Sequence, residues 1–184
     1  MIESTYAHRI DQQNGNDLVS KIRGSGLMAN QRCYWVNSFT LKTWEEAQRA
    51  GGGISGFRTP SKMLFETLSK GDYFLCYILR LKRFIAVQEV ISEAFVDDTP
   101  IWQDEIFPYR VRVRTLLKLN SETAVPVTEL SDRLSIFNKP KSWGVYFQWS
   151  PRKWRDEDGQ QVVLAIEAAV KSPIKRPFDY ENFK

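Results

Sequence analysis

Short blocks of apolar residues alternate with polar stretches along the chain, and several blocks have the composition of β-strands. Tyr34–Phe39 and Tyr73–Ile78 are rich in aromatic and β-branched residues, and the second run fits a strand buried on both faces. Phe84–Val90 predicts the next strand, across a short basic turn. Tyr109–Arg114 alternates strictly, which would place its three arginines on one face. Tyr146–Trp149 predicts a last strand.

The segments between these strands carry helix signals. Thr43 and Glu46 have the spacing of a capping box, and they predict a short helix that Gly51–Gly53 closes. Three further segments follow: a helix beginning at Pro60–Ser61, a short helix or turn over Leu130–Phe137, and a longer helix from about Asp156 to Val170. Strands with helices threaded between them indicate the α+β class, with a curled sheet or barrel flanked by helices.

The two ends of the chain are polar, and they flank a central segment that is expected to form one domain. The 184 residues, 42% of them hydrophobic, fit a single domain with some decoration. We predict a loose N-terminal extension over residues 1–32, a folded domain over residues 33–171 and a polar tail over residues 172–184. No apolar run approaches the length of a membrane span, so we expect a soluble protein without a membrane partner.

Charge alone does not account for a nucleic-acid partner. The chain has 26 lysines and arginines against 22 acidic residues, and this net charge of +4 is weak for a protein held by phosphate contacts alone. Cys33 and Cys76 lack a CxxC spacing, so we expect two reduced thiols in a cytoplasmic protein. No motif for a cofactor is present, and none is expected.

Catalytic and metal-binding motifs are sparse. The single histidine, His8, lies in the loose extension, and with two separated cysteines a zinc site is not expected. The remaining catalytic candidate is an acidic loop that contains Asp97, Asp98, Asp104 and Glu105. Such carboxylates can hold Mg²⁺ for phosphodiester cleavage, but no lysine stands among them. A nuclease is therefore the less favoured alternative, and we do not expect an enzyme.

Aromatic residues provide a stronger signal. They make up 13% of the chain, with six tryptophans, and Trp102 lies in a loop between Pro100 and Pro108. A large apolar side chain in a loop is exposed unless it covers something. Stacking of an aromatic ring on a base contributes ~1–3 kcal/mol for any base. Selectivity would then come from polar groups such as Asn37 and Ser38 at the base edge.

The order of several motifs resembles that of an EVE domain, in the PUA-like superfamily. The run EVISEAFVDDTPIW (residues 89–102), followed by FPYRVRV, is similar to the signature EVTSEPYYDDTPIW…YPYRV of that family. The closing WGVYFQWSPR…DED (residues 143–158) is similar to its FQGSPR…EED block. The similarity covers about Tyr34 to Val170.

The resemblance implies a PUA-like pseudo-barrel of mixed strands with flanking helices, related to YTH, ASCH and SRA domains. It also implies a pocket that accepts a flipped, modified base. Transferred residue by residue, that pocket contains Trp35, Asn37, Ser38, Gly56, Phe57, Tyr77, Trp102, Pro108, Tyr109, Arg110 and Phe147. Arg112 and Arg114 are candidates for phosphate contacts, although pairing with acidic residues of an adjacent strand is an equal alternative for the arginines of this run.

Two positions depart from the family pattern. Ser55 stands where the family has a tryptophan, and Trp149 stands where it has a glycine. One wall of the aromatic cage is therefore expected to be missing. Trp149 would either replace it from another direction or block the pocket.

The sequence favours a non-catalytic module that recognises a modified nucleic-acid base, in DNA or RNA, by flipping it into an aromatic-lined pocket. The resemblance adds effector proteins of a defence or RNA-modification system as partners. The alternative is a binder of a free nucleotide or another small planar ligand. Salt dependence separates the two, since only binding to a nucleic-acid backbone weakens steeply with ionic strength.

Overall fold

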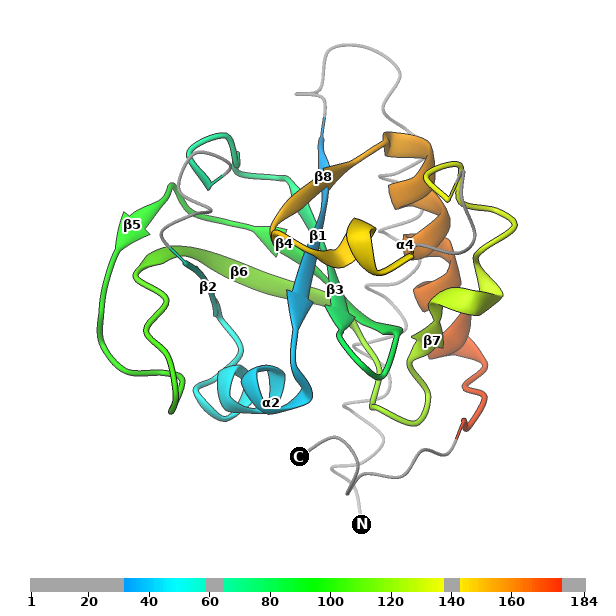
Figure 1. The fold of residues 1–184 in the computed structure, drawn as a ribbon, viewed down its shortest axis with the longest axis horizontal. Helices are drawn as coiled ribbons and strands as arrows, with labels where there is room; N and C mark the ends of the chain where they lie inside the picture. Colours follow the sequence, from blue (N-terminus) through cyan, green and yellow to red (C-terminus); the bar gives the residue numbers. More distant parts are fainter. Residues whose placement is uncertain (1–31, 59–64, 138–142, 177–184) are drawn as a thin grey trace, which may run out of the picture. The chain divides into compact units, whose positions relative to one another are not determined.

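The structure, a computed structural model, describes residues 32–58, 65–137 and 143–176, and the elements below belong to the unit Cys33–Lys184. The strands are β1 (Tyr34–Phe39), β2 (Ile54–Phe57), β3 (Tyr73–Ile78), β4 (Arg83–Val90), β5 (Phe95–Val96), β6 (Tyr109–Lys118), β7 (Val125–Pro126) and β8 (Arg152–Trp154) (Figure 1). The helices are α2 (Leu41–Arg49), α4 (Asp156–Lys171) and the 3₁₀ helices η2 (Val127–Glu129) and η3 (Trp143–Phe147).

The eight strands form one curled sheet of mixed direction. The order is β2-β6-β4-β3-β1-β8, with β5 added beside β6 and β7 beside β4. Strand β1 runs parallel to β3, and the other pairs are antiparallel. The register shifts between Cys76 and Tyr77 and between Val87 and Gln88, and such irregularities bend a sheet locally. The predicted α+β class with a curled sheet is confirmed.

Helix α4 covers the central strands on one side of the sheet (Figure 1). Its Val162, Val163 and Ile166 are fully buried, and acidic residues occupy its first turn, where the helix dipole favours them. Gly159 allows the closest approach, because a Cβ there would lie 2.2 Å from Cγ of Tyr34. The predicted helix from about Asp156 to Val170 is confirmed. Across the described ranges, no helix is both long and apolar enough to cross a membrane.

Helix α2 follows β1 directly, and its start differs from the prediction. Thr40, not Thr43, is the N-cap: the Thr40 hydroxyl accepts from the Thr43 amide, and the Thr43 hydroxyl accepts from the Thr40 amide. The predicted capping box at Thr43 and Glu46 is wrong, because Thr43 already serves as the third residue of this box. The glycine closure is confirmed, since Gly51 and Gly52 adopt positive φ after the C-cap.

The predicted strand Tyr146–Trp149 is wrong. This segment forms the end of η3 and a turn, and the strand that pairs with β1 is β8, a few residues later. Side-chain bonds hold the turn against β1, since Ser38 donates from its amide to Ser150 Oγ (2.8 Å) and from its hydroxyl to the Phe147 carbonyl (3.0 Å). Of the two alternatives for Leu130–Phe137, the turn is correct.

Two predictions lie outside the described residues. The helix expected at Pro60–Ser61 falls in 59–64, and the N-terminal extension falls almost wholly in 1–31. The domain boundaries at residues 32 and 171 stay predictions.

Candidate functional site

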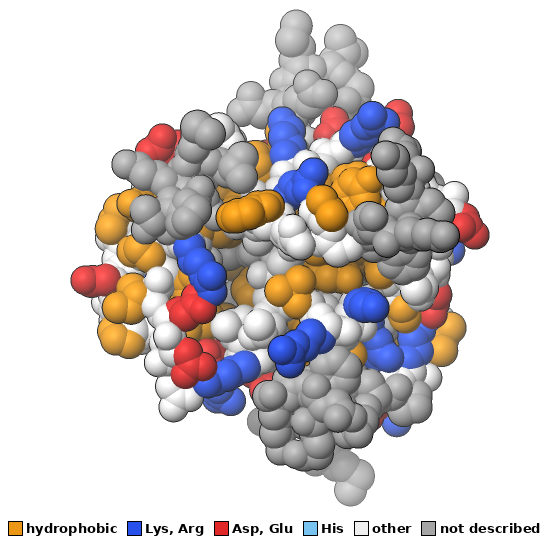
Figure 2. All heavy atoms as spheres, in the orientation of Figure 1, with side chains coloured by type: hydrophobic (Ala, Val, Ile, Leu, Met, Phe, Trp, Pro, Cys, Tyr) orange, Lys and Arg blue, Asp and Glu red, His pale blue; other side chains and the backbone are white. Residues whose placement is uncertain are grey.

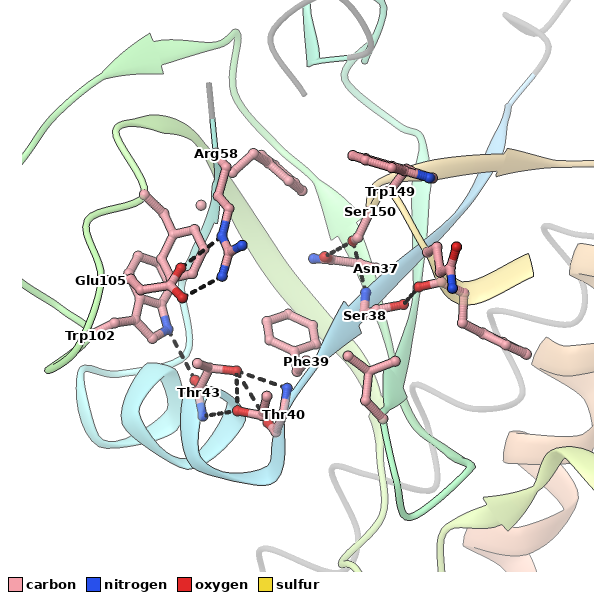
Figure 3. A pocket seen from close by; sticks show the side chains of 16 residues that line it. Asn37, Ser38, Phe39, Thr40, Thr43, Arg58, Trp102, Glu105, Trp149 and Ser150 are labelled. Atoms are coloured by element: carbon pink, nitrogen blue, oxygen red, sulfur yellow. Dashed lines mark hydrogen bonds and ion pairs between the residues drawn. The ribbon is translucent and has the colours of Figure 1, made fainter. Parts of the chain in front are cut away.

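A cavity of about 480 Å³ opens beside the end of β1 (Figure 3). Its volume lies in the range of sites for small organic ligands. One side comes from β2 and the loop before β6, and the other from the turn after η3. The lining consists of Asn37, Ser38, Phe39, Thr40, Thr43, Gly56, Phe57, Arg58, Leu79, Trp102, Glu105, Phe107, Phe147, Gln148, Trp149 and Ser150.

The polar part of the lining centres on the buried amide of Asn37. Its Nδ2 donates to Ser55 Oγ (2.6 Å), and its Oδ1 accepts from Ser150 Oγ (2.9 Å). Ser150 Oγ also accepts from the Ser38 amide, and it gives its own proton to Oδ1 of Asn37. The amide nitrogen has two hydrogens, and Ser55 uses one. Asn37 therefore retains one donor for a ligand.

Trp102 builds the first wall of the cavity, and it is only 4% exposed. Its Nε1 donates to the Thr43 carbonyl (3.0 Å), and its ring meets Phe107 edge to face at 4.8 Å. Gly56 lies against the same ring: a Cβ there would be 2.7 Å from Cη2 of Trp102. A residue larger than glycine at position 56 would displace this wall.

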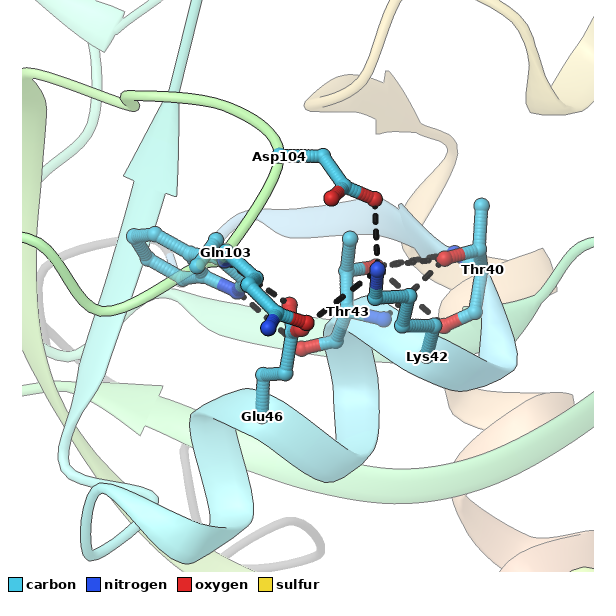
Figure 4. Close-up of polar contacts among 7 residues, drawn as sticks. Thr40, Lys42, Thr43, Glu46, Gln103 and Asp104 are labelled. Carbon is cyan, nitrogen blue, oxygen red and sulfur yellow. Dashed lines mark hydrogen bonds and ion pairs between the residues drawn. The ribbon is translucent and has the colours of Figure 1, made fainter. Parts of the chain in front are cut away.

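Ion pairs neutralise the rim of the first wall. Arg58 forms a bidentate salt bridge with Glu105, and the Arg58 guanidinium lies 5.8 Å from the centre of the Phe107 ring. Lys42 Nζ donates to Asp104 (2.6 Å), and this hydrogen bond raises the pKa of Lys42 (Figure 4). Figure 2 shows basic side chains around the middle of this face with acidic side chains beside several of them.

The buried side chain of Arg110 binds the acidic loop that precedes β6. It is 1% exposed, its Nη1 pairs with Asp97 (2.9 Å), and it donates to the carbonyls of Thr99 (2.5 Å) and Phe107 (3.0 Å). The pKa of Asp97 is lowered, first by hydrogen bonds from Thr99 and then by Arg110. Among the residues that the structure describes, no three histidine, cysteine or acidic side chains are grouped to hold a metal ion.

The three alternating arginines of β6 differ in their exposure. Arg112 and Arg114 are exposed, but the loop before β6 covers Arg110, because this loop folds back over that end of the strand. Arg114 pairs with Glu89 of the adjacent β4 (2.5 Å), and the guanidinium of Arg112 lies 5.6 Å from the Phe95 ring. Pairing with an adjacent strand, the equal alternative, is what the structure shows for Arg114.

The turn Phe147–Ser150 builds the second wall. The Phe147 ring stacks on Tyr77 with 3.7 Å between centroids and 12° between planes, so Tyr77 supports the lining from below. Burial raises the pKa of the Tyr77 hydroxyl. Trp149 is 74% exposed, with a φ of 60°, and Figure 3 shows it across the cavity from Arg58.

The structure brings together six of the predicted pocket residues and places five elsewhere. The cavity lining includes Asn37, Ser38, Gly56, Phe57, Trp102 and Phe147. Outside the lining are Trp35, Tyr77, Pro108, Tyr109 and Arg110. Trp35 is turned to another partner, since its Nε1 donates to Asp72 (2.9 Å). Arg58 was not predicted from the sequence, and Glu105 was considered only as part of the acidic loop. The two residues are 47 positions apart along the chain.

The thiols stand apart from this site. Cys76 is buried in β3, and burial raises the pKa of its thiol. Cys33 is partly exposed just before β1. His8 lies outside the described residues.

No known family profile and no curated protein matches the chain in sequence. Solved structures match it in fold. The Mmi1 YTH domain in complex with RNA is 15% identical, with a TM-score of 0.58 over 80% of this chain and 85% of that one. The YTH domain of Zygosaccharomyces rouxii MRB1 in complex with N6-methyladenosine RNA is 18% identical, with a TM-score of 0.56 over 78% and 92%.

A third match is a protein of Rhodopseudomonas palustris, 18% identical, with a TM-score of 0.54 over 74% of this chain and 94% of that one. At these identities the likeness concerns the fold. Solved domains therefore have the same mixed, curled sheet with helices that was predicted from the sequence. The chain has the α+β fold of these YTH domains.

Proposed function

We propose that this chain is an EVE-type domain that reads a modified nucleic-acid base without catalysing a reaction. The cavity beside β1 carries the proposal, because it joins aromatic walls to one buried amide with a donor to spare. Readers of flipped bases need these two elements: rings for stacking and fixed polar groups for the base edge.

The two YTH neighbours support RNA as the first nucleic acid to test, since both were solved with RNA. The acidic loop favours a non-catalytic role. Asp97, Asp104 and Glu105 are each occupied by a basic partner, so they are poorly placed to share a metal ion.

The test is a binding panel of short single-stranded RNA and DNA, each with one N6-methyladenine, one 5-methylcytosine or the unmodified base. We expect at least one modified strand to bind about tenfold more tightly than its unmodified counterpart, equivalent to ~1.4 kcal/mol. Equal binding across every matched pair would contradict the proposal.

The variant Asn37→Asp tests whether the preference for a modified base arises in the cavity. The carboxylate can accept from both Ser55 and Ser150, so the local network persists, but the amide donor is lost. We expect affinity for the preferred strand to fall about 5- to 140-fold, for an unmet bond of ~1–3 kcal/mol. Asn120→Asp is the matched control, because Oδ1 of Asn120 accepts from Thr123 and the residue lies outside the cavity lining.

Binding of a free small planar ligand, such as a nucleoside, is the second candidate, and the paired rim favours it over a free nucleotide. Arg58 and Lys42 already contact carboxylates, so the mouth of the cavity offers little charge for phosphates. If the ligand is a free nucleoside, affinity for the preferred base changes little between 50 and 200 mM salt. A strand held by phosphates weakens steeply over the same interval.

A further inference from the structure

Trp149 is the large aromatic side chain of the cavity that the protein leaves uncovered. It is 74% exposed, whereas Trp35, Trp44, Trp102 and Trp154 are each at most 4% exposed. No other described residue makes a ring, cation–π or hydrogen-bond contact with its side chain. Its ring therefore adds almost nothing to the core, and it stands at the mouth of the cavity (Figure 3).

The backbone at Trp149 is in the left-handed region, with a φ of 60°. Bulky residues rarely adopt this conformation, and glycine adopts it freely. Such conformations persist where the surroundings impose them, and they gather at ligand clamps. A tryptophan here therefore imposes strain without the compensation of a buried ring.

The residues on both sides of Trp149 fix its position. Phe147 is stacked on Tyr77, and its carbonyl accepts from Ser38. Ser150 accepts from the amide of Ser38 and donates to Asn37. The indole is thus carried by a turn that is bonded on either side to β1, next to the amide that offers a donor to a ligand.

We propose that Trp149 is the outer stacking wall of the site and covers the captured base itself. This inference rests on the proposed function and names a residue that contributes to its affinity. The base lies with its edge toward Asn37 and one face against the indole. Because the ring is free before binding, its whole contribution appears as affinity and none as fold stability.

The experiment compares Trp149→Gly and Trp149→Phe with the wild type, using free nucleosides that lack neighbouring bases: N6-methyladenosine, 5-methylcytidine and their unmodified forms. We expect Trp149→Gly to weaken binding of the preferred nucleoside about 5- to 140-fold, from ~1–3 kcal/mol of stacking. Phenylalanine should restore most of the loss. Val96→Ala is the matched control, since Val96 is 73% exposed and lies outside the cavity.

Two further readouts distinguish a stacking wall from a structural residue. The melting temperature of Trp149→Gly should equal or exceed that of the wild type, because glycine relieves the positive φ. Acrylamide quenching of tryptophan fluorescence should decrease when the nucleoside binds to the wild type, and it should change little in Trp149→Phe.

The outcomes separate the two proposals. If the wild type binds modified nucleosides and Trp149→Gly binds them equally well, Trp149 is not the wall, and the proposed function stands. If Trp149→Gly weakens binding of a strand but not of the nucleoside, the indole contacts a flanking base instead, and the inference is overturned. If the wild type binds neither the strands nor the nucleosides, the proposed function fails, and this inference fails with it.

Discussion

The two walls of the cavity each present a tryptophan, but the protein holds the two rings in opposite ways. In the first wall, the loop of residues 102–107, the ring of Trp102 is buried against Gly56 and Phe107. In the second wall, the turn Phe147–Ser150, the ring of Trp149 is exposed, and only the backbone around it is fixed. The first ring is part of the fold, whereas the second is available to a ligand.

This difference shows that an aromatic residue in a binding loop is not thereby a binding residue. Trp102 contributes packing and a hydrogen bond from its Nε1, so its removal disturbs the protein before any ligand is present. Within the described part of the chain, Trp149 has neither contact. A loss of binding after mutation therefore has a different meaning in each wall, and stability has to be measured beside affinity.

The largest expected effect is on Trp102. Truncation of this buried ring in Trp102→Ala should lower the free energy of unfolding by about 3–5 kcal/mol, because it leaves a cavity against Gly56. Urea denaturation measures the change. Trp149→Ala, the matched substitution in the second wall, should stay within about 0.5 kcal/mol of the wild type. Similar losses in both variants would remove the distinction between the walls.

A smaller effect is expected at Gly56. In Gly56→Ala the new methyl group would lie 2.7 Å from Cη2 of Trp102 and 2.8 Å from Cβ of Phe107, so the first wall must move. We expect a loss of about 1–3 kcal/mol in the free energy of unfolding. Gly144→Ala is the control, since nothing lies within 4 Å of the added Cβ. An unchanged stability of Gly56→Ala would mean that the packing on Trp102 is loose.

The smallest effect concerns the charged rim of the first wall. Glu105→Gln should change the stability by less than about 1 kcal/mol, because the Arg58–Glu105 pair is exposed. It frees Arg58, so affinity for single-stranded RNA should rise, and the slope of log K against log salt should steepen by about 0.7 for one new phosphate contact. Asp98→Asn makes the same charge change outside the cavity lining and should leave the slope unchanged.

Local signals in the sequence predicted the frame of the domain. The apolar runs of β1 and β3 and the amphipathic face of α4 are readable because burial follows a fixed period along one element. The start of α2 was misplaced by three residues, since Thr40 and Thr43 both suit an N-cap and only the observed bonds decide between them. The turn at Phe147 was mistaken for a strand, because side-chain bonds from Ser38 replace a strand ladder there.

The candidate site was only partly predictable, because contacts between distant segments decide which side chains line the cavity. The sequence analysis identified three residues of the cavity lining, Asn37, Ser38 and Trp102. Nothing local in the sequence distinguishes the buried Arg110 from the exposed Arg112 two residues later. Their difference comes from the loop that folds back over β6. Arg58 and Glu105 meet at the rim although 47 residues separate them in the chain.

The sequence by itself determined the class of fold, the central strands, the C-terminal helix and the abundance of aromatic and polar residues suited to a base. Only the tertiary structure decided which of those residues face the cavity. Exposure of a ring depends on contacts between distant segments, such as Gly56 with Trp102 and Ser38 with Ser150. Composition and periodicity describe one segment at a time, so they cannot distinguish the buried tryptophan of one wall from the free tryptophan of the other.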